Sequence, residues 1–292
     1  MKVGFVGLGL MGGPMALNIH KAGFELMVYN RSVERLVPFT ELGIKAASCP
    51  AELASECSII VTCVSDSPDV EQVYMGKGGV LEGAVQGLIT VDCSTILPQV
   101  ERKIYDKAAE LGVSHLDAPV SGGVKGAKAA TLAIMVGGDE IAFLKAQPVL
   151  DAMGKNVTYM GESGSGQVIK LANQTVLAGN MLGLCEGLVI AMKHGLDMDK
   201  TVAVLSNGTA SNWTLVNQGK QMIDCDWSAG FYAKLFKKDL SIVQALARET
   251  NSSLPCSALA LSLYNALSNI EGGDDMGHQA LLKVFRGLSG LE

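Results

Sequence analysis

The segment Gly7-Leu8-Gly9-Leu10-Met11-Gly12 limits the fold of this chain more than any other feature of the sequence. It directly follows a short apolar run at residues 3–6 and opens a helical stretch, and a second apolar run at residues 24–29 follows at the spacing of a βαβ unit. In such a turn Gly7 permits the tight change of direction, Gly9 lets the backbone approach a pyrophosphate, and Gly12 allows close packing of helix on strand. The sequence therefore predicts a dinucleotide site, with a glycine-rich turn that binds nothing as the alternative. The predicted contacts are Gly7, Leu8, Gly9, Leu10, Met11 and Gly12.

The end of the second apolar run indicates which nicotinamide cofactor is bound. NAD-dependent enzymes usually carry Asp or Glu at this position, where the carboxylate accepts the ribose 2′-hydroxyl, but this chain has Asn30 and Arg31. Since no carboxylate is there to repel it, a 2′-phosphate can be bound by the Arg31 guanidinium and the Ser32 hydroxyl. We therefore expect a preference for NADP(H), with NAD(H) as the second cofactor. The alternative is that Arg31 is only a solvated turn residue.

Composition restricts the class of protein. The chain has 292 residues, of which 48% are hydrophobic and 18% are charged, so it can bury the cores of two domains. The net charge of −6 argues against nucleic acid or an anionic membrane surface as a partner. No basic segment precedes a long apolar run near Met1, which predicts a soluble, cytoplasmic protein without a signal peptide or a membrane span.

The cysteines and histidines lack the spacing of metal ligands. The seven cysteines form no C-x-x-C pair and lie mostly in apolar segments, which predicts reduced core residues. The four histidines show no i, i+4 pairing, so we expect no metal site and interpret each histidine as a surface or helix-cap residue. These residues are Cys49, Cys57, Cys63, Cys93, Cys185, Cys225, Cys256, His20, His115, His194 and His278.

Short apolar runs alternate with helical segments up to about residue 160, a pattern that predicts an α/β Rossmann domain with a doubly wound, mostly parallel sheet. After Gly161 the sequence is helical in character, beginning with a long stretch without proline at residues 167–193. We therefore expect a Rossmann domain at residues 1–162 and an all-helical domain at residues 163–292. The expected strands are residues 3–6, 25–29, 58–64, 88–92, 114–117, 132–136 and 157–160, and the expected later helices are residues 200–205, 235–250, 258–270 and 278–287.

Two further segments carry groups that can act on a substrate. The run at residues 116–123 ends in Ser121, Gly122 and Gly123, whose hydroxyl and backbone N–H groups can hold a carboxylate; an ordinary β-to-α turn is the alternative. After a glycine-rich hinge, the helical spacing places Lys170, Asn173 and Gln174 on one face. A lysine on an apolar helix can serve as a general acid or base, and a lysine whose amine reaches solvent beside a helix cap is the alternative.

A third segment, residues 231–240, contains Phe231 and the triplet Lys238-Asp239-Leu240, which alone indicate a hydrophobic anchor and a surface ion pair. Taken together, the segments resemble the β-hydroxyacid dehydrogenase family, also named the 3-hydroxyisobutyrate dehydrogenase family, over the whole chain. The resemblance rests on G-x-G-x-x-G at residues 7–12, D-A-P-V-S-G-G at residues 117–123, G-x-G-x-x-x-K at residues 164–170 and K-D-L at residues 238–240. The second and third of these motifs are the most specific.

The resemblance implies hydride transfer between NAD(P) and a small hydroxy acid, or the reverse reduction of an aldehyde or keto acid. In this family Lys170 would protonate the carbonyl oxygen, Ser121, Gly122 and Gly123 would hold the substrate carboxylate, and Asn173 would orient the substrate or the lysine. Further cofactor contacts would come from Val64, Ser65, Thr95, Phe231 and Lys238. Two positions depart from the common pattern, because residue 65 is not proline and residue 174 is glutamine instead of asparagine.

The run Lys170-Leu171-Ala172-Asn173-Gln174 is similar to the tartronate semialdehyde reductase branch of the family, and Gln174 is accordingly expected to contact the substrate. Tartronate semialdehyde is therefore the first expected substrate, with 3-hydroxyisobutyrate, glyoxylate and succinic semialdehyde as alternatives. A non-catalytic NADP-binding module is the alternative from another class, since a fold alone does not establish activity. Lys170 favours an enzyme, because a sensor does not need a lysine on an apolar helix face.

The long helix expected at residues 167–193 also predicts assembly. At 1.5 Å per residue it would span roughly 40 Å, more than a domain of this size can cover by itself. Its apolar side chains extend nearly all round the helix. We therefore expect a homodimer or homotetramer formed through the helical domain, which the family resemblance also implies.

Overall fold

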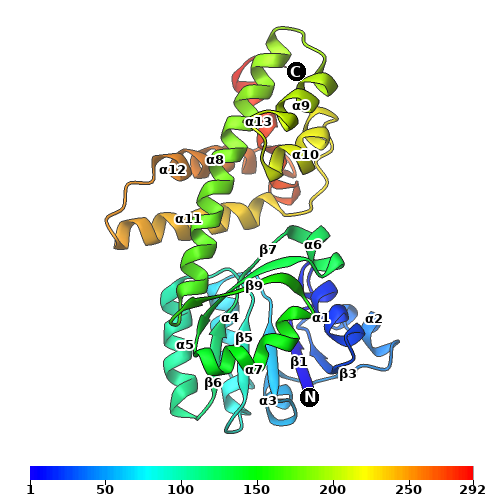
Figure 1. Ribbon diagram of the computed structural model, residues 1–292, viewed down its shortest axis with the longest axis vertical. Coiled ribbons are helices and arrows are strands. Elements are labelled where there is room, and N and C mark those ends of the chain that lie inside the picture. Colours follow the sequence, from blue (N-terminus) through cyan, green and yellow to red (C-terminus); the bar gives the residue numbers. More distant parts are fainter. Residues whose placement is uncertain (292) are drawn as a thin grey trace. The chain divides into compact units, whose positions relative to one another are not determined.

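The computed structural model describes residues 1–291, and the chain separates into two compact units, Met1–Lys170 and Leu171–Glu292. The first unit is a nine-stranded sheet flanked by helices, and the second unit is helical (Figure 1). The predicted fold class is confirmed. The two units meet within one continuous helix, α8 (Ser165–Lys193). The predicted domain boundary at residues 162 and 163 stays a prediction.

The strand order of the sheet is β3-β2-β1-β4-β5-β6-β8-β7, with β9 paired to β8. Strands β1 to β6 are parallel to one another, whereas β8 runs antiparallel to β6 and β7. The order turns back at β1, which has β2 on one side and β4 on the other, as in a doubly wound sheet. The strands are β1 (Lys2–Val6), β2 (Glu25–Tyr29), β3 (Lys45–Ala46), β4 (Ile59–Thr62), β5 (Ile89–Asp92), β6 (Ser114–Asp117), β7 (Val120–Ser121), β8 (Leu132–Gly138) and β9 (Gly154–Gly161).

The register of the parallel strands brings their carboxyl ends into one row. Val6 pairs with Thr62, Thr62 with Asp92, and Asp92 with Asp117. In open α/β sheets ligands bind outside the carboxyl ends of the strands, so the loops that follow these four residues define the candidate site of this unit.

Both faces of the sheet are buried, which explains the apolar strands. Val3 and Phe5 belong to one core cluster, and Val6 belongs to another with Ile60 and Met27. Because successive strand residues point to opposite faces, this division places one cluster on each face. The helical elements of the first unit are α1 (Gly12–Lys21), η1 (Val33–Arg35), α2 (Val37–Thr40), α3 (Pro50–Glu56), α4 (Ser67–Met75), η2 (Val80–Glu82), α5 (Pro98–Glu110), α6 (Gly123–Ala129) and α7 (Glu140–Asp151).

The second unit has its own apolar core, in which Phe236, Tyr264 and Leu281 are fully buried. Helices α11 and α12 pack against each other (Figure 1). The predicted helices are present, and α10 is an additional helix that the sequence analysis did not identify. The elements are α9 (Met198–Asn207), α10 (Trp213–Ile223), α11 (Ala233–Glu249), α12 (Pro255–Ser268), η3 (Gly273–Asp275), η4 (His278–Ala280) and α13 (Leu281–Leu288).

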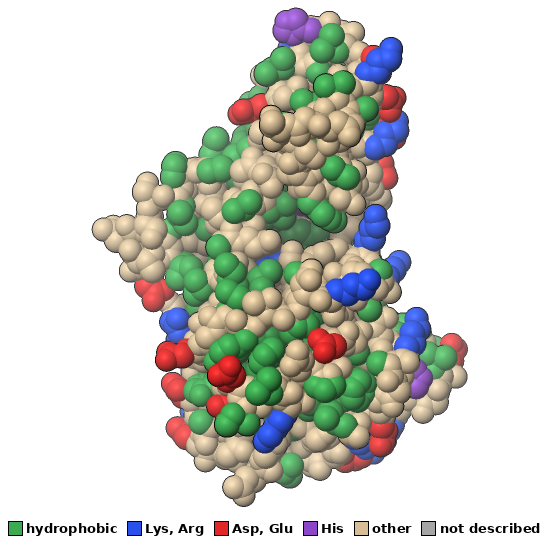
Figure 2. All heavy atoms as spheres, viewed as in Figure 1, with side chains coloured by type: hydrophobic (Ala, Val, Ile, Leu, Met, Phe, Trp, Pro, Cys, Tyr) green, Lys and Arg blue, Asp and Glu red, His purple; other side chains and the backbone are tan. Residues whose placement is uncertain are grey.

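Helix α8 is long and apolar enough, by length and composition alone, to cross a membrane, and 39% of its most apolar window is buried within the chain. Val176 and Ile190 on this helix have exposed fractions of 64% and 63%. Figure 2 shows several hydrophobic side chains on the visible face of the helical unit. Much of the apolar surface of α8 is thus not covered by its own chain.

Two expectations about single residues were wrong. His115 and His278 are buried, with exposed fractions of 1% and 3%, and are not surface or cap residues, because each finds a polar partner inside the core. Cys225 and Cys256 are exposed and so do not belong to the core.

Candidate active site

The glycine-rich loop after β1 is built as the sequence predicts. A Cβ atom on Gly7, whose φ is +95°, would lie 2.2 Å from the Cys63 carbonyl oxygen, and one on Gly12 would lie 1.9 Å from the Gly7 carbonyl oxygen. A Cβ atom on Gly9 would meet only the Arg35 Nη1 atom, at 3.7 Å. The loop is therefore tightly folded at Gly7 and Gly12 but open at Gly9, at the N-terminus of α1, which fits a bound pyrophosphate.

The residues after β2 are connected to this loop. Asn30 Oδ1 accepts a hydrogen bond from the Leu8 N–H at 2.8 Å, and Asn30 Nδ2 donates to the Ser32 carbonyl oxygen at 2.9 Å. Arg31 is exposed and forms a loose ion pair with Asp69 at 3.4 Å. No residue among 30–32 carries a carboxylate, in agreement with the basis of the cofactor prediction.

Arg35 is a cationic residue at this site that the sequence analysis missed. Its Nη1 atom donates to the Leu8 carbonyl oxygen at 3.3 Å, which holds the guanidinium beside the glycine-rich loop. The available signal was a second arginine four residues after Arg31; the structure places it in the 3₁₀ turn Val33–Arg35 after β2. Two guanidinium groups, those of Arg31 and Arg35, are thus available to an anionic group of the cofactor.

The other predicted cofactor residues of the first unit also follow carboxyl ends of parallel strands. Val64 and Ser65 follow β4, and Thr95 follows β5. The Val64 N–H donates to Ser94 Oγ at 2.9 Å, so the two loops are joined.

Behind these loops lies a buried polar network that the sequence analysis did not predict. Asp92 Oδ1 accepts from Thr62 Oγ1 at 2.5 Å and from Ser94 Oγ at 2.7 Å. Asp92 Oδ2 is buried and receives no hydrogen bond from residues 1–291.

The electrostatics of this network agree with an uncharged acid. Burial raises the pKa of Glu101 well above its ordinary value, and the Asp92 carboxylate acts in the same direction. Burial also lowers the pKa of His115 to about 3. At pH 7 the His115 imidazole is therefore neutral, and its Nε2 atom contacts Glu101 Oε2 at 2.8 Å.

Asp117 connects the motif at residues 117–123 to the helix that carries Lys170. Its Oδ1 accepts from the Gly164 N–H at 2.7 Å and its Oδ2 accepts from the Gln167 N–H at 2.9 Å. Gly166 permits this approach, since a Cβ atom there would lie 2.3 Å from the Met135 carbonyl oxygen. The carboxylate thus caps the first turn of α8, and burial raises its pKa. Lys170 follows in the second turn with an exposed fraction of 7%.

Ser121 ends β7, and the two glycines that follow have positive φ angles, +133° at Gly122 and +61° at Gly123. This conformation is natural for glycine and is strained for other residues. Because Asp117 begins this segment and caps α8, the predicted carboxylate-binding turn and the Lys170 helix share one support.

The second unit contains the remaining predicted residues. Gln174 Nε2 donates to Asp239 Oδ2 at 2.5 Å, and Asn173 Nδ2 donates to Gln174 Oε1 at 2.9 Å. Lys238 Nζ lies 2.9 Å from Asp239 Oδ1. Asp239 is 2% exposed, so this ion pair is not a surface pair as expected.

The signal for the burial of Asp239 was its place on the apolar face of α11, which also carries Phe236, Leu240 and Val243. Phe231 packs on Phe236 and on His278, with ring centroids 5.8 Å and 5.6 Å apart, and so acts as a hydrophobic anchor. The unusual glutamine at residue 174 therefore belongs to a buried polar cluster with Asn173, Lys238 and Asp239.

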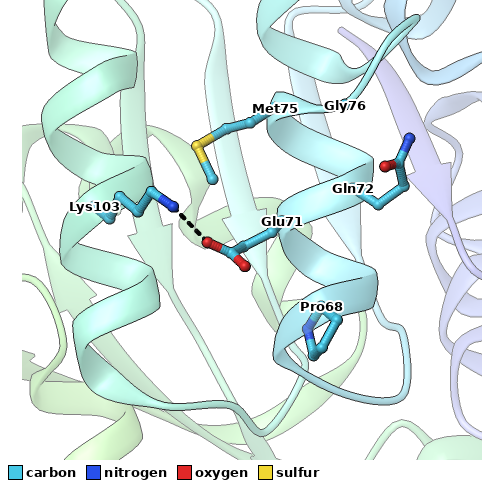
Figure 3. Close-up of a pocket in the computed structure, with 6 residues that line it drawn as sticks. All are labelled: Pro68, Glu71, Gln72, Met75, Gly76 and Lys103. Atoms are coloured by element: carbon cyan, nitrogen blue, oxygen red, sulfur yellow. Dashed lines mark hydrogen bonds and ion pairs between the residues drawn. The ribbon is translucent and has the colours of Figure 1, made fainter.

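A shallow groove of about 360 Å³ lies on the surface between α4 and α5 (Figure 3). Lys103 and Glu71 form an ion pair across it at 2.6 Å. Its lining contains no predicted site residue, so it is separate from the candidate site. The lining residues are Pro68, Glu71, Gln72, Met75, Gly76 and Lys103.

The glycine-rich loop and the row of strand ends are typical of a dinucleotide-binding domain. Residues 2–161 match the family described as the NAD binding domain of 6-phosphogluconate dehydrogenase, and residues 164–285 match the NAD-binding family of NADP-dependent 3-hydroxyisobutyrate dehydrogenase. The chain belongs to the 3-hydroxyisobutyrate dehydrogenase family of NAD(P)-dependent hydroxyacid dehydrogenases.

Individual relatives carry different names. The chain is 37% identical to the 2-hydroxy-3-oxopropionate reductase of Escherichia coli over 289 residues, covering 98% of this chain and 97% of that protein. It is also 37% identical to the NAD-dependent L-serine dehydrogenase of Pseudomonas aeruginosa over 291 residues, with 97% of each chain covered. The structure of Mycobacterium tuberculosis 3-hydroxyisobutyrate dehydrogenase with L-serine matches with a TM-score of 0.87 at 30% identity, covering 98% of this chain and 99% of that chain.

Proposed function

We propose that this protein is an NADP(H)-preferring oxidoreductase that interconverts a small carboxylate-bearing aldehyde or keto acid and its hydroxy acid. The observation that carries the proposal is the buried Lys170 on a helix whose first turn is capped by Asp117, the residue that also begins the Ser121-Gly122-Gly123 turn. A general acid and an anion-binding turn with a common support suit a substrate that has a carbonyl and a carboxylate.

In the reduction, the bound nicotinamide cofactor supplies a hydride to the carbonyl carbon. The backbone N–H groups at Gly122 and Gly123 and the Ser121 hydroxyl hold the carboxylate, which fixes the position of the carbonyl group. The Lys170 ammonium donates its proton to the carbonyl oxygen as negative charge develops there. In the oxidation the amine of Lys170 takes the proton back, while Asn173 orients the substrate or the lysine.

The cofactor preference rests on charge at the end of β2. Arg31 and Arg35 are available to a 2′-phosphate, and residues 30–32 contain no carboxylate. A charge-assisted hydrogen bond contributes roughly 1.5–3 kcal/mol, which corresponds to about one to two orders of magnitude in affinity. Arg31→Ala should therefore lower kcat/KM for NADPH by about 10- to 100-fold and leave kcat/KM for NADH nearly unchanged.

The Arg35→Ala variant should weaken the binding of both NADPH and NADH, because Arg35 also holds the Leu8 carbonyl oxygen in the loop that both cofactors use. Its effect should therefore be less selective for NADPH than that of Arg31→Ala. Asp69→Asn is the matched control, since it removes the partner of Arg31 and leaves both guanidinium groups intact. A wild-type enzyme that prefers NADH, or an unchanged preference in Arg31→Ala, would contradict the proposal.

For the substrate, we propose tartronate semialdehyde (2-hydroxy-3-oxopropanoate) first. The support is the run of residues 170–174, which is similar to the tartronate semialdehyde reductase branch, and the 37% identity to the 2-hydroxy-3-oxopropionate reductase of Escherichia coli. Absorbance at the nicotinamide band should be followed with NADPH and tartronate semialdehyde, methylmalonate semialdehyde, glyoxylate and succinic semialdehyde. The highest kcat/KM is expected for tartronate semialdehyde.

The reverse reaction separates this proposal from the other relatives. Glycerate should be oxidised faster than 3-hydroxyisobutyrate or L-serine, and a higher kcat/KM for either of these would assign the chain to that substrate instead. Absence of turnover with every substrate, with NADPH still bound, would favour a non-catalytic NADP-binding module.

We also propose a cytoplasmic homodimer or homotetramer formed through the helical unit. The support is the exposed apolar surface of the 29-residue helix α8, which includes Val176 and Ile190. Light scattering in dilute buffer should give two or four times the mass of one chain. A stable mass near 30.6 kDa would contradict this proposal.

A further inference from the structure

Gln167 lies one helical turn before Lys170, and its side chain is completely buried. The side-chain amide makes three hydrogen bonds, all of them to residues outside α8. Its Nε2 atom donates to the Ser94 carbonyl oxygen at 2.8 Å and to Glu101 Oε1 at 2.7 Å. Its Oε1 atom accepts from the Ile96 N–H at 3.1 Å.

Two of these bonds enclose one residue of the loop after β5. The carbonyl of Ser94 and the N–H of Ile96 lie on either side of Thr95, and the same planar amide binds both. The backbone around Thr95, an expected cofactor contact, is therefore fixed by a side chain from α8.

The backbone of Gln167 is fixed independently, because its N–H donates to Asp117 Oδ2. One residue thus connects three segments whose relative positions matter for the proposed reaction. They are the Thr95 loop, the end of β6 and the first turn of the Lys170 helix. Only an amide of this length has the two donors and one acceptor that the three partners require.

We propose that Gln167 is a positioning residue that fixes the position of Lys170 relative to the Thr95 loop. It thereby fixes the position of the proton donor relative to a bound cofactor and substrate. The structural part of this inference rests on the hydrogen bonds of Gln167. Its expected effect on the reaction rate rests on the proposed function. A misplacement of about 1 Å can lower the rate by about 100-fold.

The principal variant is Gln167→Met, which keeps the unbranched shape and removes all three hydrogen bonds. We expect kcat to fall about 10- to 100-fold while KM for the aldehyde changes less than about threefold, because the carboxylate-binding turn is untouched. Circular dichroism must show a folded variant at the assay temperature.

Gln167→Glu adds a second readout, the pH dependence of kcat relative to wild type, which a purely structural role would leave unchanged. Where the introduced carboxyl group is ionised, it has lost both donors and faces the Ser94 carbonyl oxygen and Glu101. As the pH falls, the carboxyl group gains a proton and becomes a donor again, so kcat relative to wild type should recover on the acid side. A ratio to wild type that is independent of pH would contradict the proposal.

Thr90→Val is the matched control. Thr90 is buried in the same network, and its hydroxyl contacts His115 Nδ1 at 2.8 Å, while His115 in turn contacts Glu101. The control should lose stability and keep the wild-type kcat. An equal fall of kcat in Gln167→Met and Thr90→Val would overturn the positioning role.

Hydrogen exchange tests the connection without turnover. In Gln167→Met the amide of Ile96 and those of residues 169–171 should exchange at least tenfold faster than in wild type and in Thr90→Val. Unchanged protection at Ile96 would overturn the inference about Gln167. Absence of aldehyde reduction by the wild-type enzyme would instead overturn the proposed function, so the two failures are distinguishable.

Discussion

Replacing Asp117 with asparagine tests the support shared by the two most specific motifs. The wild-type carboxylate is buried and accepts two backbone hydrogen bonds, from Gly164 at 2.7 Å and from Gln167 at 2.9 Å. Asparagine has one acceptor oxygen, and its NH₂ group would face the second N–H donor. One of the two bonds is therefore lost, and a buried N–H is left without an acceptor.

A hydrogen bond to a charged group contributes about 1.5–3 kcal/mol, so Asp117→Asn should lower the free energy of unfolding of the first unit by about that amount. Asp117→Ala loses both bonds and leaves a void, and should cost about 3–6 kcal/mol. Lys170 follows one helical turn after Gln167, whose N–H is one of the released groups, so kcat should fall in both variants.

Urea unfolding followed by circular dichroism measures the loss of stability in this variant. Fluorescence reports the second unit separately, because Trp213 and Trp227 both lie there. Amide exchange at Gly164 and Gln167 should be faster in Asp117→Asn, and the exposed Asp151→Asn should serve as the unchanged control. An Asp117→Asn protein within about 0.5 kcal/mol of wild type, with both amides still protected, would refute this account of the cap.

Three further predictions concern other parts of the chain. Gly12→Ala should abolish NADPH binding in a fluorescence titration, because its Cβ would lie 1.9 Å from the Gly7 carbonyl oxygen. Gly13→Ala should bind NADPH normally, because the atom nearest to its Cβ would be 3.7 Å away. Burial lowers the pKa of His278 from 6.5 to about 4, so the fold favours the neutral ring; stability is full above pH 6.5 and should fall by about 3 kcal/mol as the pH drops to 4. Tryptophan fluorescence should show a flatter pH dependence in His278→Gln and an unchanged one in the exposed His194→Gln. Glu101→Gln should lower the free energy of unfolding by less than about 1.5 kcal/mol, because burial raises the pKa of Glu101 and so favours its uncharged form. A loss of 3–5 kcal/mol, typical of breaking a buried charged pair, would contradict that protonation state.

The local features of the fold could be predicted from the sequence. The glycines at residues 7–12 indicate a tight turn, and the apolar runs indicate strands buried on both faces, as at Phe5 and Val6. The short strands β3 and β7 were missed because two residues carry no periodic signal.

The buried network could not be predicted because its members are distant in sequence. Asp92, Glu101, His115 and Gln167 meet only through the register of β5 with β6 and the packing of α5 and α8. A single charged residue in an amphipathic helix usually faces solvent, so Asp239 was wrongly expected in a surface ion pair and the buried Glu101 was not identified.

The role of Asp117 as the cap of α8 also could not be predicted from the sequence. Its motif could be identified, but the two N–H groups that it caps lie more than 40 residues later, at Gly164 and Gln167. Only the fold brings the end of β6 to the start of α8.

The measurement that most directly tests the account is the kinetics of Lys170→Ala with NADPH and tartronate semialdehyde, or with the substrate that the wild-type enzyme turns over best. Loss of the general acid should lower kcat by about 100- to 10,000-fold, while the Kd for NADPH changes only a few-fold because the phosphates are bound elsewhere. Lys193→Ala, at the exposed far end of the same helix, should behave as wild type. Activity of Lys170→Ala above one tenth of the wild-type value would contradict the proposed role of Lys170 as the proton donor.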